Sequence, residues 1–518
     1  MAPLWVKDAE NALNSKRMHE THTLSRLLRT FLTALILAAP LGSAVPLRAA
    51  PSPNVVLILA DDLGYGSVGC YGANPELVRT PNIDRLAKEG RRFTDANTPC
   101  SVCSPTRYSV LTGRYAWRTR LTSGVLGVFE PLLIETNRLT LASLLKQRGY
   151  ATAAIGKWHL GYGAAPKLDY TGELRPGPLE VGFDYHFGVP SNHGDVTGVY
   201  VENHRVCGLR SARLTPRVQA GTNFNGAPFV GLDAPHRVNE GTMPQLTAKA
   251  VNWLDQQSSA KPFFLYFTPV AVHNPVTPSS NTKGSSRAGA FGDWIHELDK
   301  CVGEVLAALD TRGLANNTIV LLTSDNGGVN HTRAQNVQTA AIKAGLKVNG
   351  PFRGGKHNVW EGGFRVPYIV RWPGRVPART SCDEMLSLAD TLATVAGVLG
   401  AKLPPQGAAE DSYDMSPTWL GVEHKTPIRP NMTVHSADGV FAIRRGPWKW
   451  IEGAPAKGAE APRARADEFH AQLYNLDQDI AETKDLAAAQ ADELNKLKLL
   501  LNQQRDQGSS SKRLSLAE

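Results

Sequence analysis

The stretch NVVLILADDLGYG, residues 54–66, is the part of the sequence from which the fold is best predicted. Residues 55–60 are an unbroken apolar run, which is typical of a strand buried on both faces in a parallel sheet. The run ends in two adjacent carboxylates, Asp61 and Asp62, followed by glycines. Asp and Gly favour solvated turns, but paired carboxylates also suit a hard cation, which binds several oxygen ligands.

Three further apolar runs have the same character as the first. They cover residues 150–155, 261–267 and 318–322. Segments with apolar residues at helical spacing lie between and after them, at 80–90, 137–149, 244–257, 292–312 and 383–399. Strands that alternate with helices predict an α/β fold whose large, mainly parallel sheet is flanked by helices on both faces.

Polar side chains follow the apolar runs, just where each strand should end. These residues are Lys157, His159, His273, Asp325 and Asn326. Each is ordinary when taken alone, as a surface lysine, a hydrogen-bonded histidine or a turn residue. Ligand sites of open α/β sheets form at the carboxyl ends of the strands, so we expect these groups to converge with Asp61 and Asp62.

The domain organisation follows from a change in pattern near residue 400. Residues 51–400 are predicted to form the large catalytic domain. Residues 400–412 are a linker rich in Pro, Gly and Ala. Short alternating runs and a last helical segment at 482–504 then predict a small antiparallel sheet with a helix within residues 413–506. Residues 507–518 read as a polar, disordered tail.

Composition and charge limit the classes of function. The chain has 518 residues, 42% hydrophobic and 20% charged, as in an ordinary globular protein. Its formal charge of +9 suits anionic substrates. It contains no block of Lys and Arg and no module of mixed aromatic and basic residues, so nucleic-acid binding is not expected.

Residues 1–50 read as a signal peptide region. Arg26 and Arg29 precede an apolar run at residues 31–41, and small residues follow, as in a secretory signal. The run is short for a membrane span, although an uncleaved anchor is the alternative, and either Met1 or Met18 is the start. We therefore expect an exported protein in a periplasm, a lumen or the medium.

The segment CSPTR, residues 103–107, leaves several interpretations open. Cys100 and Cys103 form a C-x-x-C pair that could bind zinc or cycle between thiols and a disulfide. Cys103 could also be a thiolate nucleophile at a helix N-terminus, or a buried structural cysteine. The six cysteines are irregularly spaced, which argues against a zinc ribbon.

The converging side chains help to choose among these interpretations. They offer oxygen donors at Asp61, Asp62, Asp325 and Asn326, and cations at Arg107, Lys157 and Lys356. A metal with three cations describes a site for a compact oxyanion. Calcium or magnesium prefers oxygen ligands to sulfur, so the mismatch suggests that Cys103 is chemically modified.

These motifs together resemble the type I, formylglycine-dependent sulfatases. CSPTR with LTGR at 111–114 is similar to the family signature. DDLGYG at 61–66, GKWHLG at 156–161, SDNG at 324–327, and GGK at 354–356 with WEGG at 360–363 match in the family's order. Residues 292–303 resemble the arylsulfatase A and N-acetylgalactosamine-6-sulfatase branch. The resemblance implies an alkaline-phosphatase-like fold and the hydrolysis of sulfate esters, on a sulfated carbohydrate or an aryl sulfate.

The resemblance also implies a modified residue and a metal. A maturation enzyme that reads C-x-P-x-R converts Cys103 into Cα-formylglycine (3-oxoalanine). Calcium, with magnesium as the alternative, is held by Asp61, Asp62, Asp325, Asn326 and residue 103.

Catalytic and substrate-binding roles follow from the same resemblance. Arg107 and Lys157 hold the aldehyde hydrate, His273 with Lys356 protonates the leaving alcohol, and His159 deprotonates the second hydroxyl. Asn192, Lys157, His273 and Lys356 contact the substrate. Asn192 departs from the serine that is common in this branch, and Ser67 replaces a common acid, which is not counted as a metal ligand.

Three other functions remain as alternatives. A phosphate or phosphonate monoester hydrolase would use the same scaffold. A non-catalytic protein that binds sulfated glycans would result if Cys103 is never converted. A zinc or redox protein would use the C-x-x-C pair. The oligomeric state, the sugar and the sulfated position are not indicated by the sequence.

Overall fold

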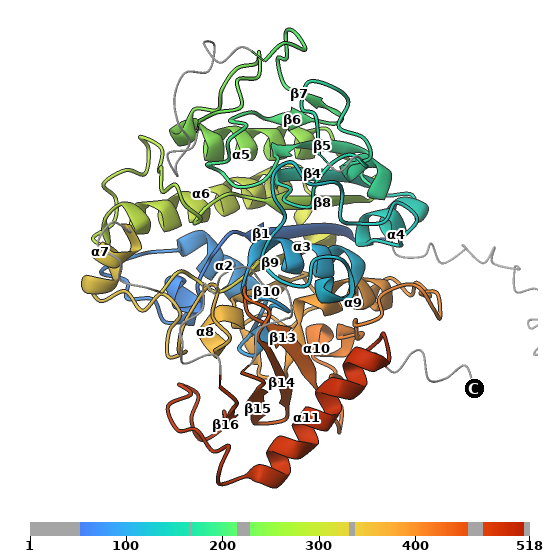
Figure 1. Ribbon diagram of the computed structural model, residues 1–518. Coiled ribbons are helices and arrows are strands. Elements are labelled where there is room, and N and C mark those ends of the chain that lie inside the picture. The colour runs from blue at the N-terminus through green and yellow to red at the C-terminus, as the bar shows by residue number, and fades with distance from the viewer. Residues whose placement is uncertain (1–51, 165–166, 215–227, 331–336, 454–469, 512–518) are drawn as a thin grey trace, which may run out of the picture. The chain divides into compact units, whose positions relative to one another are not determined.

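The computed structural model describes residues 52–164, 167–214, 228–330, 337–453 and 470–511 (Figure 1). The described part of the chain forms one compact unit. The predicted signal peptide region lies outside these residues. None of the helices in the described ranges is long and apolar enough to cross a membrane.

A large sheet organises the molecule, and in the described residues it has ten strands in the order β11-β2-β10-β9-β1-β8-β4-β5-β6-β7. The strands are β1 (Asn54–Ala60), β2 (Arg91–Phe93), β4 (Ala151–Lys157), β5 (Tyr185–Val189), β6 (Val201–Glu202), β7 (Arg205–Val206), β8 (Phe263–Thr268), β9 (Thr318–Ser324), β10 (Tyr368–Arg371) and β11 (Thr380–Cys382). The central strands β9, β1, β8, β4 and β5 are parallel, whereas β10 runs antiparallel to β9. The predicted mixed, mainly parallel sheet is confirmed.

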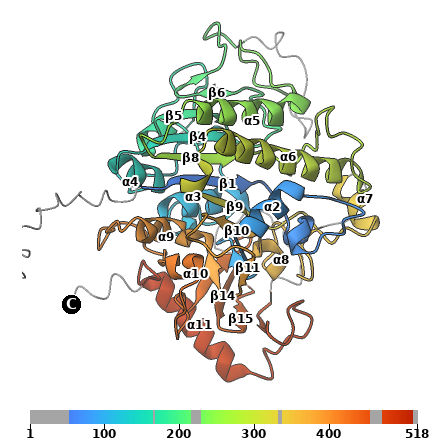
Figure 2. The same cartoon turned by 180° about the vertical axis from the view of Figure 1, so that it is seen from behind.

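Helices cover both faces of this sheet (Figures 1 and 2). Alternate residues of β1 point to opposite faces, since Val55, Leu57 and Leu59 join one apolar cluster, and Val56, Ile58 and Ala60 the other. The first face packs against α3 (Cys103–Thr112), α4 (Leu141–Gln147) and α9 (Thr391–Val398). The second packs against α2 (Pro81–Glu89), α5 (Asn239–Asp255), α6 (Gly289–Thr311) and α7 (Val337–Lys343). Burial on both sides explains why the central strands are apolar throughout.

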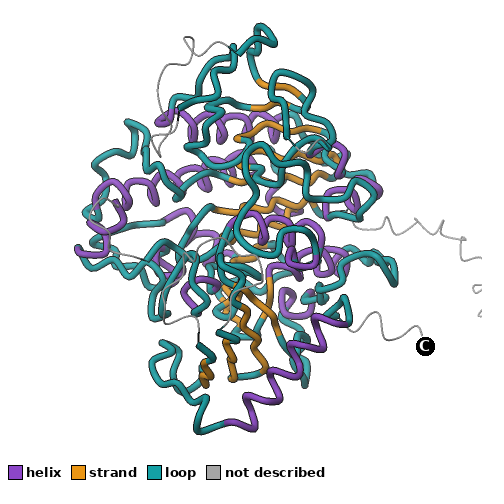
Figure 3. Tube along the Cα trace, viewed as in Figure 1, coloured by secondary structure: helices purple, strands orange, loops and turns teal. Residues whose placement is uncertain are grey.

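A small antiparallel sheet follows, as the alternating runs predict (Figure 3). It consists of β13 (Met432–His435), β14 (Phe441–Arg445), β15 (Trp448–Ile451) and β16 (Gln472–Asn475). One face packs against α11 (Ala491–Asp506) through Leu497 and Leu501. The other face packs against Val359, Trp360 and Phe364, the last in α8 (Glu361–Phe364), so this sheet leans on the segment that follows Lys356.

Three expectations about the second half of the chain are wrong in detail. The helix predicted at 383–399 begins only at Thr391, because residues 386–387 form β12 (Leu386–Ser387) beside β3 (Ala96–Asn97). The helix predicted at 482–504 begins at Ala491. Residues 507–511 are not a free tail, since Ser510 donates hydrogen bonds to Asp411 through its backbone nitrogen (3.0 Å) and its hydroxyl (2.8 Å). The short helix α10 (Ser416–Leu420) completes the elements of this half.

Candidate active site

The polar residues that follow the central strands converge at one edge of the large sheet. Asp61 and Asp325 follow β1 and β9, which are paired in parallel up to Ala60 and Ser324. The backbone nitrogen of Asp62 donates to Asp325 Oδ1 at 3.1 Å. Asp62 has a φ of 62°, which is uncommon for a residue with a side chain and is frequent at functional sites.

Asp61 and Asp325 lie in a fully buried ionic cluster. Lys157 Nζ is 2.8 Å from Asp61 Oδ2. Arg107 donates to Asp325 Oδ2 through Nε (3.0 Å) and a terminal nitrogen (2.7 Å). The same guanidinium donates to the carbonyl oxygen of Lys157 at 2.9 Å and lies 3.7 Å from Asp61 Oδ1. Both carboxylates are therefore held by cations, as buried charges require.

A second cluster surrounds Asp62. Lys356 Nζ lies 2.8 Å from Asp62 Oδ1, and the Asn326 side-chain nitrogen donates to the same oxygen at 2.7 Å. His273 Nε2 is 3.9 Å from Asp62 Oδ2. His273 Nδ1 is 2.5 Å from the carbonyl oxygen of Asn274, which fixes the ring and leaves Nε2 toward the cluster.

Cys103 lies against both clusters as the first residue of α3. Its side chain is buried, and Sγ is 3.7 Å from Asp61 Oδ1. One potential ligand atom from each of Asp61, Asp62, Cys103 and His273 lies within 4.8 Å of the others. The helix begins at Cys103 itself, so residue 103 lies at a helix N-terminus, where negative charge is stabilised.

The residues present fit a hard divalent cation. Three carboxylates and the amide of Asn326 give the oxygen-rich set that calcium or magnesium prefers. Asn326 Oδ1 is buried and has no hydrogen-bond partner among the described residues, although its nitrogen is bonded. An unsatisfied buried acceptor costs about 1–3 kcal/mol, so this oxygen is free to bind a cation.

The clusters shift the pKa values of their members. Burial alone would raise the pKa of the Asp62 carboxyl, but Lys356, His273 and Lys157 hold it below its ordinary value. Burial raises the pKa of Asp325, with Arg107 opposing and Asp61 adding to the rise. Burial, Lys157 and Arg107 hold the pKa of His159 well below its usual range. Burial, with Lys356 next, lowers the pKa of His273 to about 3.

Cys103 is poorly suited to act as a thiolate. Burial raises the pKa of its thiol to about 12, although Lys157 and Lys356 act in the opposite direction. A thiolate would be scarce at neutral pH. Cys100 Sγ is 3.6 Å from His435 Nδ1, and none of the six cysteines, all described, forms a disulfide.

Two predicted site residues, His159 and Asn192, form no hydrogen bond or ion pair with the ionic clusters in the described part of the chain. His159 Nε2 lies 3.1 Å from the carbonyl oxygen of Leu126, and Nδ1 has no partner among the described residues. Asn192 follows β5, the parallel neighbour of β4, so it belongs to the same edge of the sheet. Its Oδ1 is buried without a partner in the described part of the chain. The role predicted for Asn192 remains a prediction.

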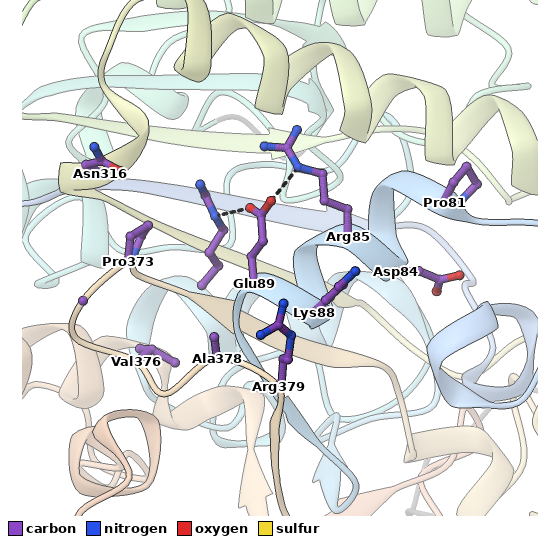
Figure 4. Close-up of a pocket in the computed structure, with 12 residues that line it drawn as sticks. Pro81, Asp84, Arg85, Lys88, Glu89, Asn316, Pro373, Val376, Ala378 and Arg379 are labelled. Atoms are coloured by element: carbon purple, nitrogen blue, oxygen red, sulfur yellow. Dashed lines mark hydrogen bonds and ion pairs between the residues drawn. The ribbon is translucent and has the colours of Figure 1, made fainter.

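The sequence did not single out several residues around these clusters. His193, Thr277 and Trp294 form a buried connection between the 190s loop and the segment that carries His273. The polar stretch 190–195 was a visible signal for a functional loop, but the partners of the His193 ring, Thr277 and Trp294, are more than 80 positions away. A hollow of about 760 Å³ along α2 is built from other residues and contains none of the predicted site residues (Figure 4).

The fold and the site define a hydrolase for a compact oxyanion ester. Buried carboxylates, two lysines and an arginine meet at the carboxyl edge of a mainly parallel sheet, where they can bind a divalent cation and an anion together. The family model described as Sulfatase matches residues 53–401. The chain belongs to the sulfatase family, and it is a sulfuric ester hydrolase.

Individual relatives agree with this assignment. The chain is 34% identical over 480 residues to an N-acetylgalactosamine-6-O-sulfatase of Bacteroides thetaiotaomicron, covering 87% of this chain and 92% of that protein. It is 34% identical over 426 residues to human arylsulfatase A, covering 80% and 77% of the two chains.

Solved structures share the architecture. A sulfatase structure from a glycosaminoglycan-metabolism locus of Bacteroides thetaiotaomicron has a TM-score of 0.78 at 33% identity, covering 88% of this chain and 99% of that one. The structure of Ps i-CgsB with a neocarrahexaose has a TM-score of 0.65 at 25% identity, covering 87% and 92%. The predicted alkaline-phosphatase-like fold is confirmed.

Proposed function

We propose that this enzyme hydrolyses sulfate esters on a sulfated carbohydrate, using a formylglycine made from Cys103 and a bound divalent cation. The observation that carries the proposal is the position of Cys103, in a buried group with Asp61 and Asp62 and beside three cationic side chains. A compact anion is stabilised where fixed positive charge is already in place and water is excluded.

The carbohydrate part of the proposal is supported by the relatives. The name of the Bacteroides thetaiotaomicron relative specifies a sulfated amino sugar, and that of the solved structure specifies glycosaminoglycans. The formal charge of +9 agrees with a polyanionic substrate. The sugar and the sulfated position would be found by assaying a panel of defined sulfated oligosaccharides.

The cation would be held by Asp61, Asp62, Asp325 and Asn326. We propose calcium as this cation, and magnesium as the alternative. When bound, the cation would neutralise charge on the sulfate group and polarise its oxygens. The hydrate of formylglycine would supply a hydroxyl group as the nucleophile for sulfur, and Asp325 would accept the proton that this hydroxyl loses. Both groups depend on side chains that are already fixed by the contacts described above.

The protein's own side chains would orient these groups and move protons. Lys157 and Arg107, held by Asp61 and Asp325, would fix residue 103 from one side. Lys356 would bind a sulfate oxygen. A bound sulfate anion beside His273 would favour its imidazolium form, which would take a proton from solvent on Nε2 and give it to the leaving alcohol. His159 would take the proton of the second hydroxyl, which restores the aldehyde and releases sulfate.

The proposal extends to the maturation and the location of the protein. A formylglycine-generating maturation enzyme would act on the C-x-P-x-R segment, and residues 1–50 would direct export. We also propose residues 51–400 as the catalytic domain and 413–506 as the subdomain that supports it.

Mass analysis of the peptide that contains residue 103 tests the proposal most directly. Active protein should carry an aldehyde at position 103, and Cys103→Ser should be inactive when expressed without a maturation enzyme that converts serine. Fully active protein with an unmodified thiol would disprove the mechanism. Comparison of an aryl sulfate with an aryl phosphate separates sulfatase from phosphatase activity, and binding of a sulfated glycan without turnover would indicate the non-catalytic alternative.

A further inference from the structure

Two basic segments meet at a different edge of the large sheet. The first segment, residues 85–92, contains the end of α2 and the first two residues of β2. The second segment, residues 371–379, begins with the last residue of β10 and leads to β11. Both segments lie together because β2 pairs with β10 and with β11. Between them lies a hollow of about 760 Å³ (Figure 4).

The hollow has an excess of positive charge. Its two acidic lining residues are already engaged: Asp84 Oδ1 accepts from the backbone nitrogen of Cys70 at 2.7 Å, and Glu89 pairs with Arg85 (2.7 Å) and Arg371 (2.8 Å). Lys88 and Arg379 are exposed lining residues, and neither has an acidic partner among the described residues.

The hollow is separate from the catalytic centre. Arg371, in its lining, pairs with Val320 near the start of β9, whereas Asp325 follows the end of that strand. Five residues of a strand span roughly 16 Å. A ligand in the hollow therefore leaves the carboxyl edge of the sheet open.

We propose that this hollow binds a sulfated polysaccharide through Lys88 and Arg379. This proposal rests on the proposed function, which gives the enzyme a sulfated carbohydrate as its substrate. A polymer with repeated sulfate groups can place one sulfate group on these cations while another occupies the catalytic centre of the same or a neighbouring enzyme molecule. Such a second contact raises the effective concentration of substrate without changing the chemistry. Monomeric substrates gain nothing from it.

The test compares Lys88→Ala/Arg379→Ala with Lys484→Ala/Lys498→Ala, which removes the same charge from exposed positions elsewhere. The probes are immobilised chondroitin sulfate and an aryl sulfate. The variant in the hollow should elute at lower salt and show an apparent KM for the soluble polymer raised by about 3- to 10-fold. Its turnover of the aryl sulfate should not change.

Equal losses of retention in the two variants, or no loss in either, would overturn the proposal. Equal weakening of binding to a DNA control would show unspecific attraction and would also overturn it. An enzyme that releases sulfate from neither the polymer nor the aryl sulfate, but is still retained through Lys88 and Arg379, would instead contradict the proposed function, so the two failures are distinguishable.

A second observation concerns His193, which is buried between two elements near the catalytic centre. His193 Nε2 is 2.8 Å from the hydroxyl of Thr277, four residues after His273. Its ring lies 6.0 Å from the ring of Trp294, centre to centre. Trp294 Nε1 in turn donates to the carbonyl oxygen of His273 at 3.1 Å.

The backbone of His193 is also held in place. Its carbonyl oxygen accepts a hydrogen bond from Arg237 at 3.0 Å, and Arg237 forms a buried ion pair with Asp195 at 3.2 Å. The imidazole is thus attached to a fixed loop and contacts the His273 segment through Thr277 and Trp294.

We infer that His193 is a positioning residue for His273, again on the basis of the proposed function. Removing its ring would leave the Thr277 hydroxyl without this partner and open space beside Trp294. His273 would then be displaced from the leaving group, and the departure of alcohols that need protonation would suffer most.

A series of aryl sulfates with leaving groups of graded pKa tests this inference. His193→Ala and Thr277→Val should each lower kcat for poor leaving groups by about tenfold and hardly affect good ones, and His193→Gln should restore part of the loss. His186→Ala is the control, since this buried histidine bonds to Ala154 and Tyr162 instead. The inference would be overturned if His193→Ala slowed the reaction equally for all leaving groups, or if Thr277→Val had normal kinetics. Absence of any sulfatase activity in the wild type would instead contradict the proposed function.

Discussion

Lys356 Nζ lies 2.8 Å from Asp62 Oδ1, although 294 positions separate the two residues in the sequence. The segment between α7 and α8 and the loop after β1 thus meet through a buried ion pair. The pair gives Asp62 a low pKa and places a fixed positive charge beside the carboxylates that would hold a cation.

Lys356→Ala should lower kcat by about 10²–10³, because it removes a cation that would bind the sulfate group in the transition state. Steady-state kinetics with an aryl sulfate measures the effect. Lys347→Ala, at an exposed lysine nine positions earlier, is the matched control and should behave as the wild type. A Lys356→Ala enzyme of normal kcat would remove Lys356 from the mechanism.

His273→Ala should slow poor leaving groups far more than good ones, since only alkoxide-like leaving groups need a proton. The measurement is the slope of log kcat against the pKa of the leaving alcohol, which should become steeper. His296→Ala, on α6 but away from the clusters, should keep the slope of the wild type. The same loss for every substrate would rule out His273 as the general acid.

Removal of divalent cations should abolish activity, and added calcium or magnesium should restore it. Thermal unfolding gives an independent measurement, because a cation that binds only the folded state raises Tm with its concentration. Asn326→Ala should reduce this rise, since it deletes the unpartnered Oδ1. Asn316→Ala, an exposed amide elsewhere, should not. A Tm that is independent of the cation in the wild type would contradict the metal site.

Lys449→Met should destabilise the protein by about 3–5 kcal/mol, because it leaves the buried carboxylate of Glu482 without its cation and removes one of the three cations beside Glu361. Lys449 Nζ is 3.1 Å from Glu361 Oε1 and 2.8 Å from Glu482 Oε1, and all three side chains are buried. Chemical denaturation measures the change in the free energy of unfolding. Lys498→Met, on the exposed side of α11, should change it by less than about 0.5 kcal/mol.

Stability should depend on the protonation of Glu361. Burial raises its pKa, but Arg444, Lys449 and Arg365 outweigh burial and hold the pKa below its ordinary value. A depressed pKa in the folded state contributes stability above the unfolded value of about 4.3, and the contribution is lost as pH falls through the folded value. The difference in unfolding free energy between wild type and Glu361→Gln should therefore shrink between about pH 5 and pH 3. A constant difference over this range would show that Glu361 is not charged in the folded protein.

The central sheet was predictable because its strands are buried on both faces, so runs such as residues 55–60 and 318–322 are unbroken. The convergence of Asp61, Lys157, His273 and Asp325 followed from their common place after such strands. The short strands β2 and β11 escaped notice, since the arginines of β2 and the polar residues Thr380 and Ser381 of β11 form no apolar run. Their pairing is decided by tertiary contacts.

The supporting residues were less predictable than the site itself. Lys449 and Glu482 have no local signal, because a buried charge is recognised only through partners that are remote in sequence. The same holds for His193 and its bond to Thr277. The helix at 482–504 was predicted from leucines at helical spacing, which all lie at or after Leu494 and give no information about where the helix begins. Glu482 adopts a left-handed conformation in the turn before α11.

The burial of α3 has a consequence for the order of events during biosynthesis. Every residue from Cys103 to Thr112 is buried in the folded protein, and the backbone nitrogen of Ser101 donates to the carbonyl oxygen of His435 at 3.2 Å. An enzyme that reads C-x-P-x-R would find no accessible peptide once this contact exists. The proposed conversion must therefore occur before β13 packs against this segment. During that interval, more than three hundred later residues are still kept away from the nascent segment by the ribosome or an export channel.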